Sequence, residues 1–366
     1  MLILAIETSC DETSVAVLKG NEKNNSVQII SNVISSQVKL HAQWGGVVPN
    51  LAAREHVKNI TLVLKQALSS AKIALADIDL FSVTNKPGLI PALLVGVNTA
   101  KTLSYFYQKP LLGVHHIEGH MMGAFFDKNN RCKITSENFP LLCLTISGGH
   151  TQLILSPSLL SYKIIGETQD DAAGEAFDKV AKMLELAYPG GPIVEKLANE
   201  YFLENGHSNI LKLPRPMLNS KNFDFSFSGL KTAVLYQWEK QKNKLSKNKL
   251  TELKKQFCYE FQQAVAEVLV KKTLTATQKY NPKTIILAGG VAANQTIRAT
   301  LKKTINKNFP QTDFFSPAFT LCGDNAAMIG AASFFHFQVL KKQNKLTSLS
   351  QNWKNLPTIA NAKINQ

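Results

Sequence analysis

A strand–turn–strand pattern that occurs twice in the sequence is the feature that most constrains the fold. In the first copy, apolar segments at residues 2–6 and 13–18 flank an acidic, hydroxyl-bearing turn. In the second copy, residues 141–146 and 152–155 flank the turn Ser-Gly-Gly-His-Thr. Segments of this kind, joined by a short polar turn, are typical of β-hairpins. Because helical segments follow each hairpin, the sequence predicts a duplicated α/β domain with a cleft between the two copies.

The length and composition fit a folded protein with two domains. The chain has 366 residues, 45% hydrophobic and 18% charged, which is enough for two separate cores. No apolar run reaches membrane-spanning length, and the first residues resemble a strand rather than a secretory or transit signal, so a cytoplasmic location without membrane contact is expected. Five scattered cysteines argue against a disulfide framework and against a cysteine-based zinc site: Cys10, Cys132, Cys143, Cys258 and Cys322.

The net charge of +15 favours a polyanionic partner such as a nucleic acid. The alternative is a general lysine and asparagine bias that adds charge to every solvated face. Residues 239–255 are dense in lysine and helical in pattern. This segment is the best candidate for a contact with nucleic acid, although such runs are most often simply solvated.

Two histidines spaced four residues apart indicate a possible metal site. On a helix, His116 and His120 would lie on one face, where two neutral imidazoles can share a divalent ion. The alternative is a polar turn that happens to hold several of the eight histidines. Asp324, in front of a later helix of small residues, can supply a distant third ligand. A metalloprotease is disfavoured, because Glu118 stands one residue later than the glutamate of the zincin motif.

Two glycine pairs suggest phosphate or nucleotide binding. Gly148 and Gly149 would let the backbone approach a ligand and present N–H groups to a phosphate, or they simply satisfy a tight hairpin turn. A buried strand at residues 284–288 runs into Gly289, Gly290 and a helix. Nucleotides bind at such junctions in α/β folds, although short connections also use glycine for other reasons.

A third candidate feature is the acidic segment at residues 167–178. Acids in a first helical turn normally complement the helix dipole. However, Asp171, Glu175 and Asp178 would share one helix face, where like charges repel unless a cation or ligand uses them.

Nine segments in this order resemble those of the tRNA N6-adenosine threonylcarbamoyltransferases, the TsaD family, formerly known as glycoproteases or O-sialoglycoprotein endopeptidases. The resemblance runs from residue 1 to about 335 and rests on residues 7–12, 45–49, 116–120, 147–151, 170–179, 188–192, 226–231, 289–294 and 324–325. Two positions depart from the family pattern. Lys86 stands where glycine is usual, and Gly323 stands where threonine is usual and could loosen the placement of Asp324.

The resemblance implies a two-lobed fold like that of actin, hexokinase and the heat-shock chaperone ATPases. Such a fold consists of duplicated, ribonuclease H-like mixed sheets around a nucleotide cleft. We expect an N-terminal lobe from residues 1–125 and about 321–340, and a C-terminal lobe from residues 126–320. Residues 341–366 are polar and without periodicity, and are expected to form a mobile tail.

The resemblance also implies an acyltransferase that modifies tRNA. The family transfers threonylcarbamoyl from threonylcarbamoyl-AMP to N6 of adenosine 37 in tRNAs reading codons that begin with A, and so forms threonylcarbamoyladenosine and releases AMP. The implied protein partners are the smaller actin-like TsaB and the ATPase TsaE. Three alternatives remain: a small-molecule kinase of the same superfamily, a non-enzymatic module that presents tRNA, and the older protease interpretation.

By position, the resemblance assigns site residues in this sequence. The implied metal ligands are His116, His120 and Asp324, a set that suits Fe²⁺ first and Zn²⁺ second. The implied contacts to the adenylate are Ser147, Gly148, Gly149, Asp178, Gly191 and Asn294. Asp11 is our candidate for accepting the proton from the adenine amine, with Glu12 as the alternative.

Overall fold

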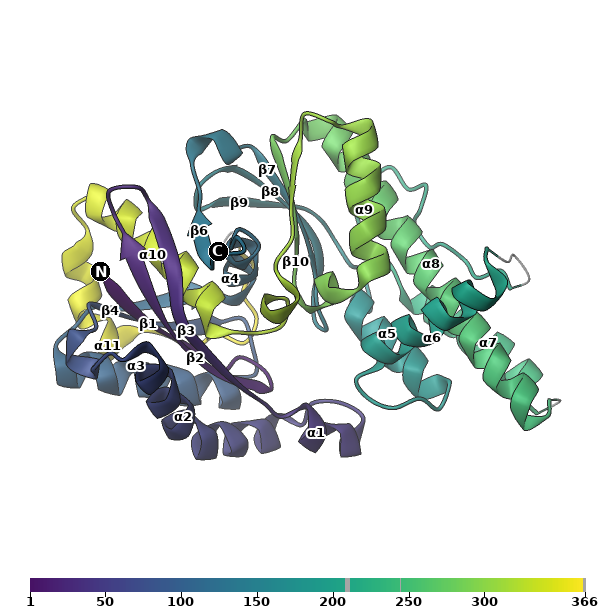
Figure 1. Cartoon of the computed structure of the whole chain (residues 1–366), viewed down its shortest axis with the longest axis horizontal. Coiled ribbons are helices and arrows are strands. Elements are labelled where there is room, and N and C mark those ends of the chain that lie inside the picture. The colour runs from purple at the N-terminus through teal and green to yellow at the C-terminus, as the bar shows by residue number, and fades with distance from the viewer. Residues whose placement is uncertain (208–210, 244, 365–366) are drawn as a thin grey trace. The chain divides into compact units, whose positions relative to one another are not determined.

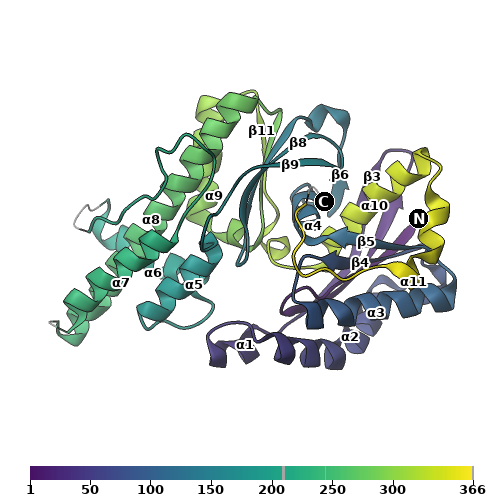
Figure 2. The ribbon, with the colours of Figure 1, turned by 180° about the vertical axis from the view of Figure 1, so that it is seen from behind.

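The computed structural model describes residues 1–207, 211–243 and 245–364, which fall into two compact units (Figures 1 and 2). Unit 1 contains Met1–Asn138, Ser158–Tyr162 and the described residues from Phe315 onwards. Unit 2 contains Phe139–Pro157 and Lys163–Phe314. Relative to the lobes expected from the sequence, unit 1 also takes in residues 126–138, 158–162, 315–320 and the described part of the C-terminal tail.

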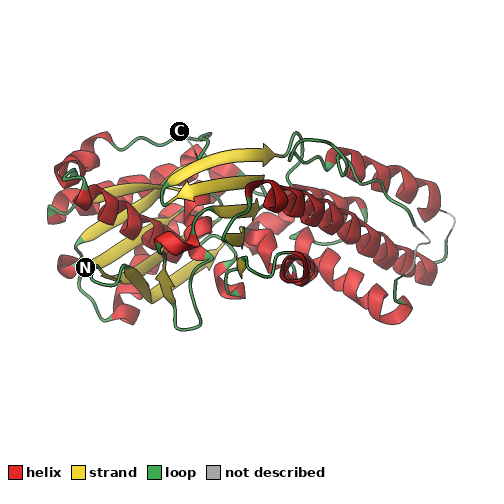
Figure 3. Cartoon of the chain, turned by 90° about the horizontal axis from the view of Figure 1, so that it is seen from above, coloured by secondary structure: helices red, strands yellow, loops and turns green. Residues whose placement is uncertain are grey.

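Unit 1 is built on a six-stranded mixed sheet with the order β5-β4-β1-β2-β3-β6. Strand β1 pairs antiparallel with β2 and parallel with β4, so the first predicted hairpin is confirmed. The apolar strands are buried on both faces because helices cover both sides, as Figure 3 shows. The strands are β1 (Leu2–Glu7), β2 (Glu12–Asn21), β3 (Ser26–Ser36), β4 (Leu80–Lys86), β5 (Leu111–His115) and β6 (Arg131–Lys133).

Three long helices cover this sheet. Helices α2 (Pro49–Ala71) and α3 (Ile90–Tyr107) pack on one face, and α10 (Ala326–Lys342) packs on β1 and β2 from the other (Figure 1). The core between the sheet and the first two helices includes Leu4, Ile6, Val15, Val17, Ile60, Val63, Val97 and Ala100. Burying this many aliphatic side chains, at about 1.5–3 kcal/mol each, is the main stabilisation of unit 1. The short helix α1 (Val38–His41) precedes α2.

Unit 2 repeats the plan with a five-stranded mixed sheet of order β11-β10-β7-β8-β9. Strand β7 pairs antiparallel with β8 and parallel with β10, which confirms the second hairpin. The strands are β7 (Leu141–Ile146), β8 (Thr151–Ser158), β9 (Ser161–Glu167), β10 (Thr284–Ala288) and β11 (Asp313–Phe315). The helices are α5 (Ala173–Met183), α6 (Gly190–Asn205), α7 (Ser228–Lys242), α8 (Lys247–Tyr280) and α9 (Gln295–Asn308). The two mixed sheets confirm the predicted duplicated α/β fold class.

The C-terminal tail packs against unit 1 instead of forming the unstructured extension that its polar sequence suggests. It contains a 3₁₀ helix, Leu346–Gln351, and the short helix α11 (Asn352–Asn355), which packs on α3 (Figure 2). Trp353 and Leu356 lie against the core. Beyond them, the Ile359 N–H donates to the carbonyl of Asn85 at 3.0 Å. A few isolated apolar side chains anchor this segment, which is why it has no periodic pattern in the sequence.

The lysine-rich segment at residues 239–255 forms two helices rather than one, because α7 ends at Lys242 and α8 begins at Lys247. Several of its lysines are already paired with carboxylates: Lys255 lies 2.7 Å from Glu204, and Lys254 lies 3.5 Å from Glu185. Pairing of this kind reduces the charge available to a polyanion. Among the described residues, no helix combines the length and the apolarity needed to cross a membrane.

Candidate metal centre and nucleotide pocket

Both predicted histidine ligands lie on a short buried helix that directly follows the edge strand β5. Helix α4 (His116–Gly123) begins where the Nδ1 of His115 accepts a hydrogen bond from the N–H of Ile117, at 3.2 Å. His116 and His120 are one turn apart, and their ring centroids lie 4.6 Å from each other. The spacing in the sequence therefore does place the two imidazoles on one helix face, as predicted.

Close packing of α4 on α10 brings the distant carboxylate to the histidines. A Cβ atom at Gly119 would lie 2.7 Å from the end of the Ile329 side chain, so glycine lets the two helices pack closely without moving that side chain. Asp324 stands just before α10, and its Oδ1 lies 3.1 Å from the His120 Nε2 and 3.5 Å from the His116 Nε2. The expected loosening by Gly323 is countered by Asn325, which donates to the Gly323 carbonyl at 2.9 Å.

The three side chains form a donor set that fits one divalent cation. One ligand atom from each of His116, His120 and Asp324 can be chosen so that all three lie within 4.8 Å of one another. The His120 side chain is 1% exposed and that of Asp324 is 20% exposed, so the cluster is enclosed but reachable from one side. Two imidazoles and one carboxylate with a remaining open side suit a divalent transition metal ion.

Carboxylates surrounding His116 change its proton affinity. Burial alone would lower the pKa of His116, but Asp324 and Glu7 raise it to about 9. A positive charge is therefore favoured at this position, supplied either by a proton or by a cation.

The candidate proton acceptor Asp11 lies in the turn between β1 and β2, and the alternative, Glu12, is the first residue of β2. Burial, followed by the charges of Asp324 and Asp11, raises the pKa of Glu12 to about 10. A carboxyl group with this pKa carries its proton near neutral pH and cannot act as a general base in that state. Glu12 also shares a hydrogen bond with Asp11, so the two carboxyl groups hold a proton between them as a pair. Burial and Asp11 also raise the pKa of Cys10, which keeps this thiol protonated and poorly nucleophilic.

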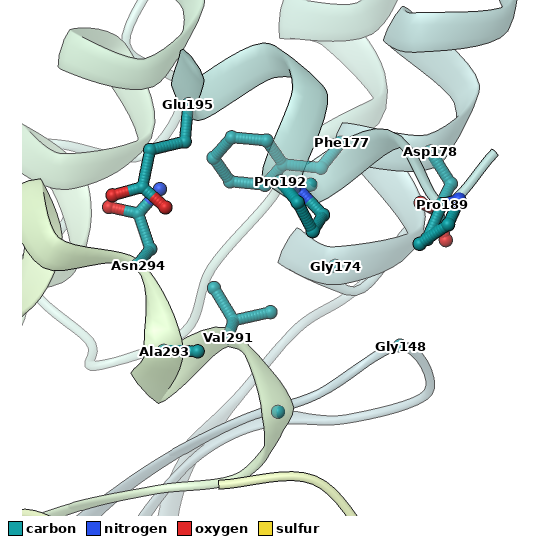
Figure 4. A pocket seen from close by; sticks show the side chains of 12 residues that line it. Gly148, Gly174, Phe177, Asp178, Pro189, Pro192, Glu195, Val291, Ala293 and Asn294 are labelled. Carbon is teal, nitrogen blue, oxygen red and sulfur yellow. The ribbon is translucent and has the colours of Figure 1, made fainter. Parts of the chain in front are cut away.

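Unit 2 contains a cavity of about 190 Å³ at the end of its sheet (Figure 4). Four of the six predicted adenylate contacts line it, namely Gly148, Asp178, Gly191 and Asn294. The other two, Ser147 and Gly149, flank Gly148 in the same turn, which is closed by a hydrogen bond from the Ser147 N–H to the His150 carbonyl at 2.8 Å. Gly290, from the second glycine pair proposed for nucleotide binding, also lines it. The further lining residues were not predicted as contacts: Gly174, Phe177, Pro189, Pro192, Glu195, Val291 and Ala293.

Polar side chains around the cavity also hold the helix ends that shape it. Asp178 accepts from the N–H of Gly190, the first residue of α6, at 2.7 Å. Asn294 caps α9 by accepting from the Ile297 N–H at 2.9 Å. Glu195 accepts from the Gln295 N–H at 2.6 Å, and burial raises its pKa. The predicted contacts Asp178 and Asn294 therefore contribute to the shape of the cavity.

Two of the three acids of the face predicted around α5, Asp171 and Glu175, are paired with lysines within unit 2, whereas Asp178 lines the cavity. Asp171 lies 2.7 Å from Lys179 and 2.6 Å from Lys231, and Glu175 also pairs with Lys179. Burial would raise the pKa of Asp171, but its hydrogen bonds and ion pairs with the two lysines lower it below its usual value. At Asp171 and Glu175, lysine side chains thus take the place of the cation or ligand that the charge pattern suggested.

The two mixed sheets define an α/β protein that shares its fold with solved structures of HypF. The crystal structure of T. kodakarensis HypF superposes with a TM-score of 0.58 at 13% identity, and the match covers 93% of this chain and 48% of that one. A family model for tRNA N6-adenosine threonylcarbamoyltransferase, TsaD, matches residues 28–331.

Curated proteins of the same name align over most of the chain. The chain is 45% identical over 336 residues to the tRNA N6-adenosine threonylcarbamoyltransferase of Syntrophomonas wolfei, covering 92% of each sequence. It is also 45% identical over 336 residues to that of Listeria monocytogenes serotype 4b, covering 92% of this chain and 91% of the relative. The chain therefore belongs to the tRNA N6-adenosine threonylcarbamoyltransferase family, which confirms the resemblance and makes it an acyltransferase of tRNA modification.

Proposed function

We propose that the chain transfers the threonylcarbamoyl group of threonylcarbamoyl-AMP to N6 of adenosine 37, in tRNAs reading codons that begin with A. The convergence of His116, His120 and Asp324 on one point is the observation that carries this proposal. The glycine-lined cavity of unit 2 supports it, since a nucleotide monophosphate needs both an enclosed surface and close backbone approach.

In the proposed reaction, the N6 amine attacks the carbamoyl carbon of the mixed anhydride. A new C–N bond forms, the bond from that carbon to the phosphate oxygen breaks, and AMP leaves with the electron pair. The proton lost by N6 passes to Asp11. Because an exocyclic amine is a weak nucleophile, positioning and charge stabilisation must supply most of the rate enhancement.

Residues of unit 2 would hold the adenylate. The turn at Ser147, Gly148 and Gly149 would present backbone N–H groups to the phosphate. Gly191 would allow close approach of the nucleotide, and the side chains of Asp178 and Asn294 would orient it. Gly148, Gly191, Asp178 and Asn294 all line the same cavity, which supports this division of roles.

Residues of unit 1 would hold one divalent metal ion, with Fe²⁺ preferred and Zn²⁺ second. The ligands would be one nitrogen each of His116 and His120 and an oxygen of Asp324. When bound, the ion would supply positive charge that stabilises an anionic adenylate. We further propose a cytoplasmic protein that works with TsaB-like and TsaE-like partners, and in which exposed lysines of residues 239–255 contact tRNA.

The test combines the purified protein, both partners, threonylcarbamoyl-AMP and unmodified tRNA, with nucleosides analysed by mass. His116→Ala or His120→Ala should retain the fold but lose both bound metal and product. His336→Ala is a matched control, because this half-buried histidine pairs with Glu118 and lies outside the ligand cluster. Full metal occupancy in either ligand variant would refute the ligand assignment, and tRNA-independent ATP turnover would favour a kinase instead.

A further inference from the structure

A fully buried carboxylate lies directly behind one of the two histidine ligands. Glu7 is the last residue of β1, and its side chain is 0% exposed. Its Oε2 lies 3.2 Å from the Nδ1 of His116, which also lies 3.1 Å from the Ser9 hydroxyl. Burying a charge without partners is strongly unfavourable, so this carboxylate must be compensated by the groups it contacts.

Two further donors hold the Glu7 carboxylate in place. The Ser9 N–H donates to Oε1 at 2.5 Å, and the Thr84 hydroxyl on the neighbouring strand β4 donates to Oε2 at 2.5 Å. Because these donors come from the strand–turn junction and from an adjacent strand, the carboxylate has a fixed position. The His116 ring must therefore adapt to Glu7 rather than the reverse.

This contact determines which nitrogen of His116 is available to a metal. An ionised carboxylate only accepts hydrogen bonds, so a neutral His116 must carry its proton on Nδ1. Its lone pair then lies on Nε2, the atom 3.5 Å from the Oδ1 of Asp324. A second carboxylate that accepts from the far nitrogen of a histidine ligand fixes the ring orientation and makes the ligating nitrogen more basic.

We infer that Glu7 is a positioning residue that orients His116 so that its Nε2 binds the metal ion. This inference rests on the metal centre of the proposed function. It assigns Glu7 no contact with substrate or with the metal ion.

Glu118 offers a matched control. Its carboxyl group is also buried, lies on α4 itself, and pairs with a histidine, His336, at 2.8 Å and with the hydroxyl of Tyr162 at 2.7 Å. His336 is not part of the ligand cluster. Replacing either glutamate by glutamine removes a buried charge next to an imidazole. Of the two imidazoles, only that of His116, the partner of Glu7, is a proposed metal ligand.

The experiment measures Zn²⁺ affinity of the full-length apo protein by competition with a chromophoric chelator, and stability by urea unfolding. Glu7→Gln should weaken Zn²⁺ binding by about 10- to 100-fold, whereas Glu118→Gln should retain the wild-type affinity. Thr84→Val, a nearly isosteric change, removes one hydrogen-bond donor to Glu7 and should give an intermediate loss of Zn²⁺ affinity. This variant tests the same role if Glu7→Gln does not fold. In the wild-type Zn²⁺ complex, ¹⁵N NMR should show His116 protonated on Nδ1.

Different failures have different meanings. Unchanged affinity in both Glu7→Gln and Thr84→Val, an equal loss in Glu118→Gln, or a metal bound to Nδ1 would overturn the role of Glu7 alone. A wild-type protein that binds no Zn²⁺ or Fe²⁺ would overturn the metal centre of the proposed function, and the role of Glu7 with it.

Discussion

Two adjacent glycines at the end of β10 should respond to substitution in opposite ways. Gly289 has a φ of +90°, and a Cβ there would lie 2.4 Å from the Ile146 carbonyl oxygen. Gly290 lines the cavity of unit 2, and a Cβ there would meet none of the described atoms within 4 Å. We therefore expect Gly289→Ala to damage the fold and Gly290→Val to damage nucleotide binding.

The magnitudes follow from these surroundings. An alanine in the conformation of Gly289 costs about 1–3 kcal/mol, and displacing the Ile146 backbone costs roughly another 1–3 kcal/mol. Together these terms reach roughly 2–6 kcal/mol, a large part of the roughly 5–15 kcal/mol that keeps a protein folded. Gly290→Val should change the free energy of unfolding by no more than about 0.5 kcal/mol. Its isopropyl group should weaken AMP binding at least tenfold, about 1.4 kcal/mol.

Urea unfolding followed by circular dichroism and AMP titration by calorimetry test both expectations on the same samples. Wild-type AMP affinity in Gly290→Val would show that the nucleotide does not occupy this cavity. Wild-type stability in Gly289→Ala would contradict the steric argument for the turn after β10.

Three further predictions concern charge. Asp171→Asn should lower the unfolding free energy by about 1–2 kcal/mol in urea titrations, because two lysines lose their shared partner; an unchanged midpoint would refute this. Burial lowers the pKa of His56 in the folded chain. The unfolded chain therefore takes up a proton near pH 6.5 that the folded chain does not, and the free energy of unfolding should fall as the pH drops below about 6.5. His56→Gln should flatten that dependence between pH 7.5 and 5.5, and an equal slope would contradict it. The double variant Lys240→Glu, Lys249→Glu should weaken tRNA binding more at 50 mM than at 200 mM salt. Unchanged affinity at both salt concentrations would exclude residues 239–255 as a tRNA contact.

Much of the fold was predictable because its main elements are long apolar segments bounded by clear turn signals. Both hairpins and the strand β10 have the residue ranges that their sequence patterns predict to within a few residues. The lysine-rich run at residues 239–255 was less predictable. A uniform charge pattern contains no signal for the break between α7 and α8, since lysine suits both a helix and its exposed end.

The candidate site was predictable only in part. The four-residue spacing of His116 and His120 places two imidazoles on one helix face without any tertiary information. The approach of Asp324 depends on how α4 packs against α10. The sequence offered Asp324 only as a distant carboxylate in front of a helix, and the family resemblance assigned it as a ligand. Glu7 was not singled out as a partner of His116, because the two residues are 109 positions apart and are brought together by the sheet. Their contact has no local signature.

The C-terminal tail shows how a segment without a sequence pattern can still contribute to the site. The Nε2 of His115 lies 3.1 Å from the carbonyl oxygen of Ala362, an acceptor, so this nitrogen carries the proton. The Nδ1 of His115 is then the acceptor, and it is this atom that caps the first turn of α4 through the N–H of Ile117. The tail thus selects the tautomer that caps the helix bearing both candidate histidine ligands. A sequence pattern reports burial and periodicity, whereas this link depends on a single backbone carbonyl, which any residue at position 362 would supply.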